Sequence, residues 1–171
     1  MTDAKNNSSK TEVAILAGGC FWGVEHILRK IPGILETSVG YTGGTTENPT
    51  YKEVCTGSTG HAEAIEIIFD PSIITFKQIL DYFFRMHNPT TMNRQHNDIG
   101  TQYRSGIFYT SEEQKRIATE MKNQVQASGK WNKPIVTEIT PATRFWSAEE
   151  YHQDYLLKNP DGYNCHILEG V

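Results

Sequence analysis

The stretch VAILAGGCFWG, residues 13–23, decides the fold. Its first part, residues 13–17, is a short apolar run bounded by two glycines, which is typical of a buried strand. A helix is predicted to follow at once, because apolar residues then recur at helical spacing until Pro32 and Gly33 end the pattern. The recurring residues are Phe21, Val24, Ile27 and Leu28.

The rest of the chain mixes strands with helices. Further strands are predicted over residues 34–41, 61–69, 107–109 and 135–139, and further helices over residues 76–86, 111–128 and 146–157. Long polar segments at 42–60 and 87–106 are interpreted as functional loops. This order favours one α/β or α+β domain with a mixed central sheet flanked by helices. We expect a disordered lead-in over 1–11 and a single catalytic domain over 12–171.

Composition excludes several classes of protein. The 171 residues carry 16 Lys and Arg against 20 Asp and Glu, a formal net charge of −4, so the basic footprint of a nucleic-acid binder is missing. Hydrophobic residues make up 37% of the chain and mean hydropathy is −0.50, which is typical of a soluble globular protein. No apolar run reaches the roughly 20 residues of a membrane span, and no signal segment opens the chain. We therefore expect a cytoplasmic protein.

The three cysteines are expected to be thiols, because an odd number without a secretory signal does not indicate a disulfide framework. Their spacing does not match a zinc site. The phosphate-binding and dinucleotide-binding glycine loops are absent, and so is the serine nucleophile elbow G-x-S-x-G. Cys55, just before Thr56 and Gly57, is predicted to be a small packing residue.

Cys20 is the first candidate for chemistry. It stands where the first strand ends and the first helix begins, next to Gly18 and Gly19. Unpaired N–H groups and the positive end of the helix dipole favour a thiolate there, so the pKa of the thiol should fall. Phe21 and Trp22 would wall the sulfur with aromatic surface. The alternative is a buried cysteine in a glycine-rich turn, with both aromatics in the core.

Glu63 is the second candidate. In the strand 61–69 it shares a face with Ile65, Ile67 and Phe69, which mark that face as buried. A carboxyl facing the core is desolvated, which raises its pKa and makes it a possible general acid near neutral pH. The alternative is that the strand has reached the sheet rim at this point and Glu63 bends into water.

Other polar side chains gather in the two long loops and the tail. Tyrosine hydroxyls there could donate a hydrogen bond to a substrate oxygen that gains charge in a transition state. More commonly, a loop tyrosine packs its ring against the protein and exposes its hydroxyl to water. Cys165 could meet a reactive thiol as a resolving cysteine, or it could be an exposed bystander. The loop residues are Tyr41, Tyr51, Asn97, Asp98, Gln102 and Tyr103.

Four motifs together resemble the type A peptide-methionine sulfoxide reductases. They are Gly19-Cys20-Phe21-Trp22-Gly23, Gly60-His61-Ala62-Glu63-Ala64, Gly100-Thr101-Gln102-Tyr103-Arg104-Ser105 and Tyr151-His152-Gln153. They occur in the family's order, and the resemblance runs from about residue 13 to 167. It implies a two-layer, ferredoxin-like α/β plait with a coil-rich C-terminal tail over 158–171.

The resemblance also implies a role for each matching residue. Cys20 would be the nucleophile, Glu63 the proton donor, and Cys165 the resolving thiol. Tyr51 and Tyr103 would bind the sulfoxide oxygen, Phe21 and Trp22 would cradle the S-methyl group, and Asp98 would hold the substrate or the site. The implied substrate is the S epimer of methionine sulfoxide, free or in proteins, with thioredoxin as reductant. No metal or organic cofactor, nucleic acid or membrane is implied, and we expect a monomer.

Two other functions stay open at this point. A cysteine acyl transferase or hydrolase would need a histidine base beside Cys20 and an oxyanion hole, and it would not need Cys165. The histidines at 61, 87, 96 and 152 could serve, but the sequence places none of them. A thiol redox sensor without turnover would oxidise Cys20 with peroxide and would not depend on Glu63.

Overall fold

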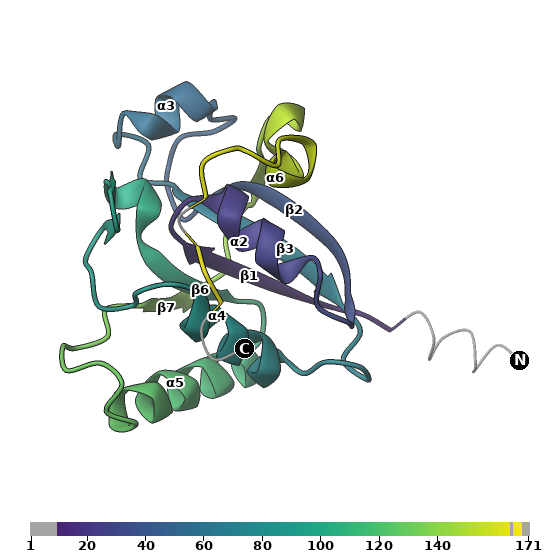
Figure 1. Ribbon diagram of the computed structural model, residues 1–171, viewed down its shortest axis with the longest axis vertical. Helices are drawn as coiled ribbons and strands as arrows, with labels where there is room; N and C mark the ends of the chain where they lie inside the picture. The colour runs from purple at the N-terminus through teal and green to yellow at the C-terminus, as the bar shows by residue number, and fades with distance from the viewer. Residues whose placement is uncertain (1–9, 165, 169–171) are drawn as a thin grey trace, which may run out of the picture.

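The computed structural model describes residues 10–164 and 166–168. The fold is built on a six-stranded sheet in the order β7-β6-β1-β3-β2-β8, with helices packed against it (Figure 1). Two predictions lie outside the described residues: most of the disordered lead-in, which falls on residues 1–9, and the resolving thiol at Cys165.

The core of the sheet has the β-α-β-β-α-β order of a ferredoxin-like plait. Its elements are β1 (Glu12–Gly18), α2 (Phe21–Leu28), β2 (Ile34–Thr42), β3 (Ala62–Phe69), α4 (Phe76–Met86) and β6 (Ser105–Tyr109). The four strands lie in the order β6-β1-β3-β2, and every pair is antiparallel. The predicted fold class is therefore confirmed.

Two additions widen this plait. Helix α5 (Glu112–Ala127) crosses from β6 to β7 (Glu138–Pro141), the only strand of the described sheet that runs parallel to its neighbour. At the other edge, β8 (Trp146–Ser147) pairs with β2. A helical crossover is how parallel strands are normally joined.

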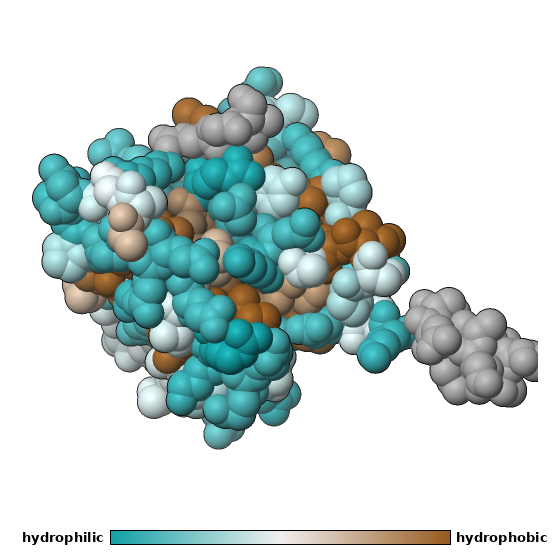
Figure 2. All heavy atoms as spheres, turned by 90° about the horizontal axis from the view of Figure 1, so that it is seen from below, coloured by the Kyte–Doolittle hydropathy of each residue, from teal (hydrophilic) through white to brown (hydrophobic). Residues whose placement is uncertain are grey.

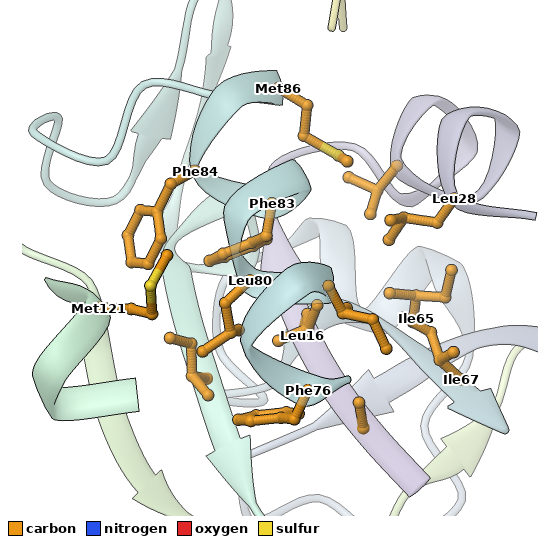
Figure 3. Packing of buried hydrophobic residues seen from close by; sticks show 14 of the residues in the cluster. Leu16, Leu28, Ile65, Ile67, Phe76, Leu80, Phe83, Phe84, Met86 and Met121 are labelled. Carbon is orange, nitrogen blue, oxygen red and sulfur yellow. The ribbon is translucent and has the colours of Figure 1, made fainter. Parts of the chain in front are cut away.

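The main core lies between one face of the sheet and the helices (Figure 3). Strand side chains such as Leu16, Ile65 and Ile67 meet the apolar stripe of α4, which includes Leu80 and Phe83 and is fully buried. Thr75 starts α4 with a capping box that involves Gln78. The stripe is the feature that predicted this helix, and its bounds are as expected.

Helix α5 is mostly polar and covers the same layer beside α4. Only Gln114, Ala118 and Met121 of its sixteen residues are buried. Viewed from below, the face of the molecule that carries α5 is largely hydrophilic, with apolar residues in small separate patches (Figure 2). No helix of the described residues is long and apolar enough to cross a membrane.

The helix predicted over 146–157 is wrong. The segment instead forms β8, a 3-10 turn η2 (Glu150–His152) and the short helix α6 (Tyr155–Lys158). Asp154 takes a left-handed conformation with φ of 54°, which interrupts a helix. The side chain of Gln153 also bonds the backbone of Val39 in β2, so tertiary contacts override the helical pattern.

Smaller differences concern strand ends and loops. The strand predicted at 135–139 pairs only from Glu138 onward, opposite Gly106. The two polar loops contain short elements that were not predicted: α3 (Tyr51–Cys55), β4 (Arg94–Gln95), β5 (Asp98–Ile99) and the 3-10 turn η1 (Thr101–Tyr103). Helix α3 had a readable signal, the capping box of Thr50 and Glu53.

Candidate active site

Cys20 occupies the N-cap position of α2, immediately before its first helical residue. The turn from β1 into α2 passes through Gly19 with φ of 95°, a conformation that glycine adopts without strain. The Cys20 side chain is nearly buried, with 9% of its surface exposed. A thiol in this position stands at the positive end of the helix dipole, which favours its thiolate.

Glu63 lies against the same helix terminus. It is 1% exposed, and its Oε1 accepts a hydrogen bond of 3.1 Å from the backbone N–H of Phe21. Its Oε2 is buried and has no hydrogen-bond partner among the described residues. Burial raises the pKa of Glu63 to about 8, the Phe21 N–H opposes this shift, and the charge of Asp98 adds to it. The carboxyl is therefore largely protonated at neutral pH. It is held on the backbone of Phe21, the residue that follows Cys20.

Two tyrosines from the polar loops surround this carboxyl. Tyr51 begins α3 and Tyr103 ends η1. Burial raises the pKa of both phenols, and the nearby charge of Glu63 raises it further, so each keeps its hydroxyl proton. Both are hydrogen-bond donors beside the protonated acid.

Asp98 in β5 closes another side of the site. Its charge acts on both Glu63 and Tyr103, and its Oδ2 accepts a hydrogen bond of 3.3 Å from Tyr163 in the tail. Within the part of the chain that the structure describes, strand β5 pairs only with β4, so Asp98 lies on a small separate hairpin.

The aromatic pair after Cys20 forms a wall. Phe21 is 1% exposed and packs its ring 5.8 Å from that of Tyr41. Trp22 is partly buried, and its indole stacks on Tyr155 with ring centres 3.8 Å apart. This wall gives the site an apolar side opposite in character to the acid and hydroxyl donors.

Two further residues hold the groups of the site, and the sequence analysis assigned this role to neither of them. His152 accepts a 2.9 Å hydrogen bond from the indole of Trp22 and packs against the Tyr51 ring. Glu149 accepts from the hydroxyl of Tyr41 and from the backbone N–H of Tyr51. The segment holding both was predicted as a helix, which hid that their partners lie about a hundred residues earlier in the chain.

The prediction for Cys55 is wrong. It was expected to pack inside, but it is exposed at the end of α3. The hydroxyl of Tyr51, one helical turn earlier, donates a hydrogen bond to the Cys55 sulfur, and partial burial raises the pKa of the Cys55 thiol. No group of three or more possible metal ligands occurs within residues 10–164 and 166–168.

A cysteine at a helix terminus beside a protonated carboxyl combines a possible nucleophile with a possible proton donor, which is typical of thiol-dependent enzymes. Residues 12–170 match the family model of peptide methionine sulfoxide reductase, and the chain belongs to that family of oxidoreductases.

Known relatives agree with this assignment. The chain is 60% identical over 158 residues to a probable peptide methionine sulfoxide reductase of Schizosaccharomyces pombe, covering 90% of this chain and 93% of the relative. Among solved structures, Mxr1 from Saccharomyces cerevisiae in reduced form has a TM-score of 0.89 at 43% identity, covering 94% of this chain and 93% of that one. Mxr1 in complex with Trx2 has a TM-score of 0.64 at 29% identity, with 94% and 91% covered.

Proposed function

We propose that the chain reduces the S epimer of methionine sulfoxide, with Cys20 as nucleophile and Glu63 as proton donor. The observation that carries this proposal is the buried Glu63 carboxyl, held on the Phe21 N–H next to Cys20. A sulfoxide sulfur becomes a good electrophile only when its oxygen is protonated during attack. A carboxyl that keeps its proton near neutral pH can supply that proton.

The first step balances within the site. The Cys20 thiolate attacks the sulfoxide sulfur while Glu63 gives its proton to the oxygen. Attack forms a bond between the Cys20 sulfur and the substrate sulfur. The OH group then moves to the Cys20 sulfur as this bond and the sulfur–oxygen bond of the substrate break, which leaves a sulfenic acid on Cys20 and releases methionine. The substrate sulfur is reduced as the Cys20 sulfur is oxidised, and a proton from water restores Glu63.

The surrounding residues orient the substrate. Tyr51 and Tyr103 hold hydroxyl protons and donate to the sulfoxide oxygen as its charge grows. Phe21 and Trp22 take the S-methyl group against their rings. The polar donors and the aromatic wall are not interchangeable, which supports selection of one sulfoxide epimer. Asp98, on its hairpin beside the site, accepts a backbone N–H of free or protein-bound substrate.

Cys165 resolves the sulfenic acid in this scheme, giving a disulfide with Cys20 and one water. Thioredoxin then reopens the disulfide by thiol–disulfide exchange. The complex of yeast Mxr1 with Trx2 supports this partner. Both thiols must start reduced, which suits a cytoplasmic location. Membership of a reductase family argues against the acyl-transfer and sensor alternatives.

A single turnover tests the proposal. Fully reduced protein is mixed with the S epimer of a methionine sulfoxide peptide without reductant, and methionine and thiols are counted. We expect about one methionine per chain and loss of two thiols, mapped to Cys20 and Cys165. One methionine with Cys165 still reduced would contradict the resolving role alone. No methionine would contradict the reductase mechanism, and equal turnover of the R epimer would contradict the selectivity.

A further inference from the structure

The C-terminal tail returns to the turn that carries the nucleophile. After α6 the chain runs as coil past α2 toward α4 (Figure 1). In this exposed segment His166 stands out, because it is only 4% exposed while the neighbouring Ile167 is 76% exposed. A polar ring that is buried within an exposed tail needs a specific partner to offset its desolvation.

That partner is the backbone just before Cys20. Nε2 of His166 lies 2.7 Å from the carbonyl oxygen of Gly18, the last residue of β1. A carbonyl oxygen only accepts, so Nε2 carries the proton and donates. The backbone N–H of His166 in turn donates to Oδ1 of Asn164 at 3.0 Å. The tail residues on both sides of position 165 are thus joined to each other and, through His166, to the nucleophile turn.

The surface of α2 is shaped to receive this ring. A Cβ added at Gly23 would overlap Nδ1 of His166 and lie 2.7 Å from Oδ1 of Asn164. Glycine inside a helix is less favourable than alanine, so its presence in the first turns of α2 calls for a reason. The close approach of the tail supplies that reason.

We propose that His166 is a positioning residue that docks the tail on the nucleophile turn, and that docking speeds the step in which Cys165 closes the disulfide. The inference rests on the proposed function, because it takes Cys165 as the resolving thiol. A docked tail presents the thiol at high effective concentration, whereas an undocked tail must find Cys20 by diffusion of a tethered chain.

The accelerated step balances without an added oxidant. The Cys165 thiolate attacks the sulfur of the Cys20 sulfenic acid, the S–S bond forms and the S–O bond breaks. Hydroxide leaves with the proton that the Cys165 thiol has released, giving water. The sulfenic sulfur is reduced by one unit as the Cys165 sulfur is oxidised by one unit.

The test separates the two chemical steps in the full chain. Reduced protein is mixed rapidly with the S epimer, and methionine, remaining thiols and sulfenic acid trapped by dimedone are followed in time. For His166→Ala and Gly23→Ala we expect methionine to form at the unsubstituted rate, while disulfide closure slows by about tenfold or more. His166→Gln, whose amide can still donate to Gly18, should recover part of the closure rate, and Ile167→Ala should match the unsubstituted protein.

The outcomes are distinguishable. Equal rates of disulfide closure in all variants would overturn the positioning role of His166. The role would also be overturned if methionine formation slowed as much as disulfide closure, because His166 would then support the structure of the whole site. Failure of the unsubstituted protein to form the Cys20–Cys165 disulfide would instead overturn the resolving role itself. Thermal unfolding of each variant confirms that it is folded. Gly23→Ala tests docking with the His166 side chain unchanged.

Discussion

At the scale of single residues, the proposed chemistry depends most on one carboxyl, that of Glu63. Strand alternation with Ile65 and Ile67 indicated a buried Glu63, and the structure decides against the alternative of a carboxyl at the sheet rim because Glu63 is 1% exposed. Its pairing with the Phe21 N–H could not be inferred from the sequence, since that contact joins positions 42 apart. The partners of Glu149 and His152 escaped for the same reason, because they depend on tertiary contacts that no local pattern encodes.

Replacing Glu63 by Gln should remove the proton donor and little else. Glutamine has the shape of the protonated acid, and its side-chain oxygen can still accept from the Phe21 N–H. We expect kcat/KM for sulfoxide reduction to fall by about 10²- to 10⁴-fold, the usual contribution of a general acid. Alkylation of Cys20 by iodoacetamide should persist, because the helix terminus is unchanged. A variant with undiminished turnover would remove Glu63 from its role.

The raised pKa of Glu63 also predicts two pH dependences. Activity should fall as pH rises through about 8, where the donor loses its proton. Stability should fall in the same direction. The folded carboxyl keeps its proton up to about 8 while the unfolded one loses it near 4.5, so the contribution present at low pH is lost as pH rises through the folded value.

Urea unfolding at pH 5 and pH 9 checks the stability part. The free energy of unfolding should drop more between these values for the unsubstituted protein than for Glu63→Gln, which has no proton to lose at this site. Parallel pH dependence of the two proteins would show that the Glu63 pKa is not raised. The activity part is read from the alkaline limb of kcat/KM in the unsubstituted protein.

At the scale of elements, a strong apolar periodicity predicted helices correctly, whereas a weak one predicted a helix that does not form. The apolar stripe predicted α4 with its observed bounds, and the range predicted for α5, residues 111–128, differs from the observed one by one residue at each end. Residues 146–157 also show apolar spacing, but the left-handed Asp154 and the strand pairing of β8 decide their structure. Neither is visible to a local pattern, because one depends on a single backbone angle and the other on a strand a hundred residues away.

Two threonine caps allow a matched test of α3 at the site. Thr50 caps α3 and Thr75 caps α4, each with a complete capping box. Changing either to Ala should cost about 1 kcal/mol of local helix stability. For Thr75→Ala the cost should appear in global unfolding with kcat/KM unchanged, because α4 belongs to the core.

For Thr50→Ala the effect should appear at the site instead. Helix α3 has five residues and only Val54 is buried, so it can open locally without unfolding the sheet. Because α3 carries Tyr51, we expect a several-fold fall in kcat/KM with a smaller loss of global stability. Steady-state kinetics and urea unfolding of both variants measure the contrast. Equal effects of the two variants on kcat/KM would show that the position of Tyr51 does not depend on its cap.

At the scale of the whole molecule, the fold brings the first strand and the C-terminal tail together. Strand β1 delivers Cys20, and the tail returns to the same turn through His166. The proposed scheme therefore requires both Cys20 and Cys165 for repeated turnover, although only Cys20 is needed for one reduction. The sequence offered the two cysteines for this role, but it contained no local signal of where the tail docks.

Cys165→Ser separates these requirements. With thioredoxin as the only reductant, we expect about one methionine per chain and then a stall, because the Cys20 sulfenic acid has no thiol to form the disulfide that thioredoxin reduces. A small dithiol such as dithiothreitol should restore turnover of the same variant, since it can attack the sulfenic acid directly and then close on itself. The restored turnover would show that Cys20 and Glu63 are intact. Sustained turnover with thioredoxin alone would mean that thioredoxin resolves Cys20 itself, and that the tail has another purpose.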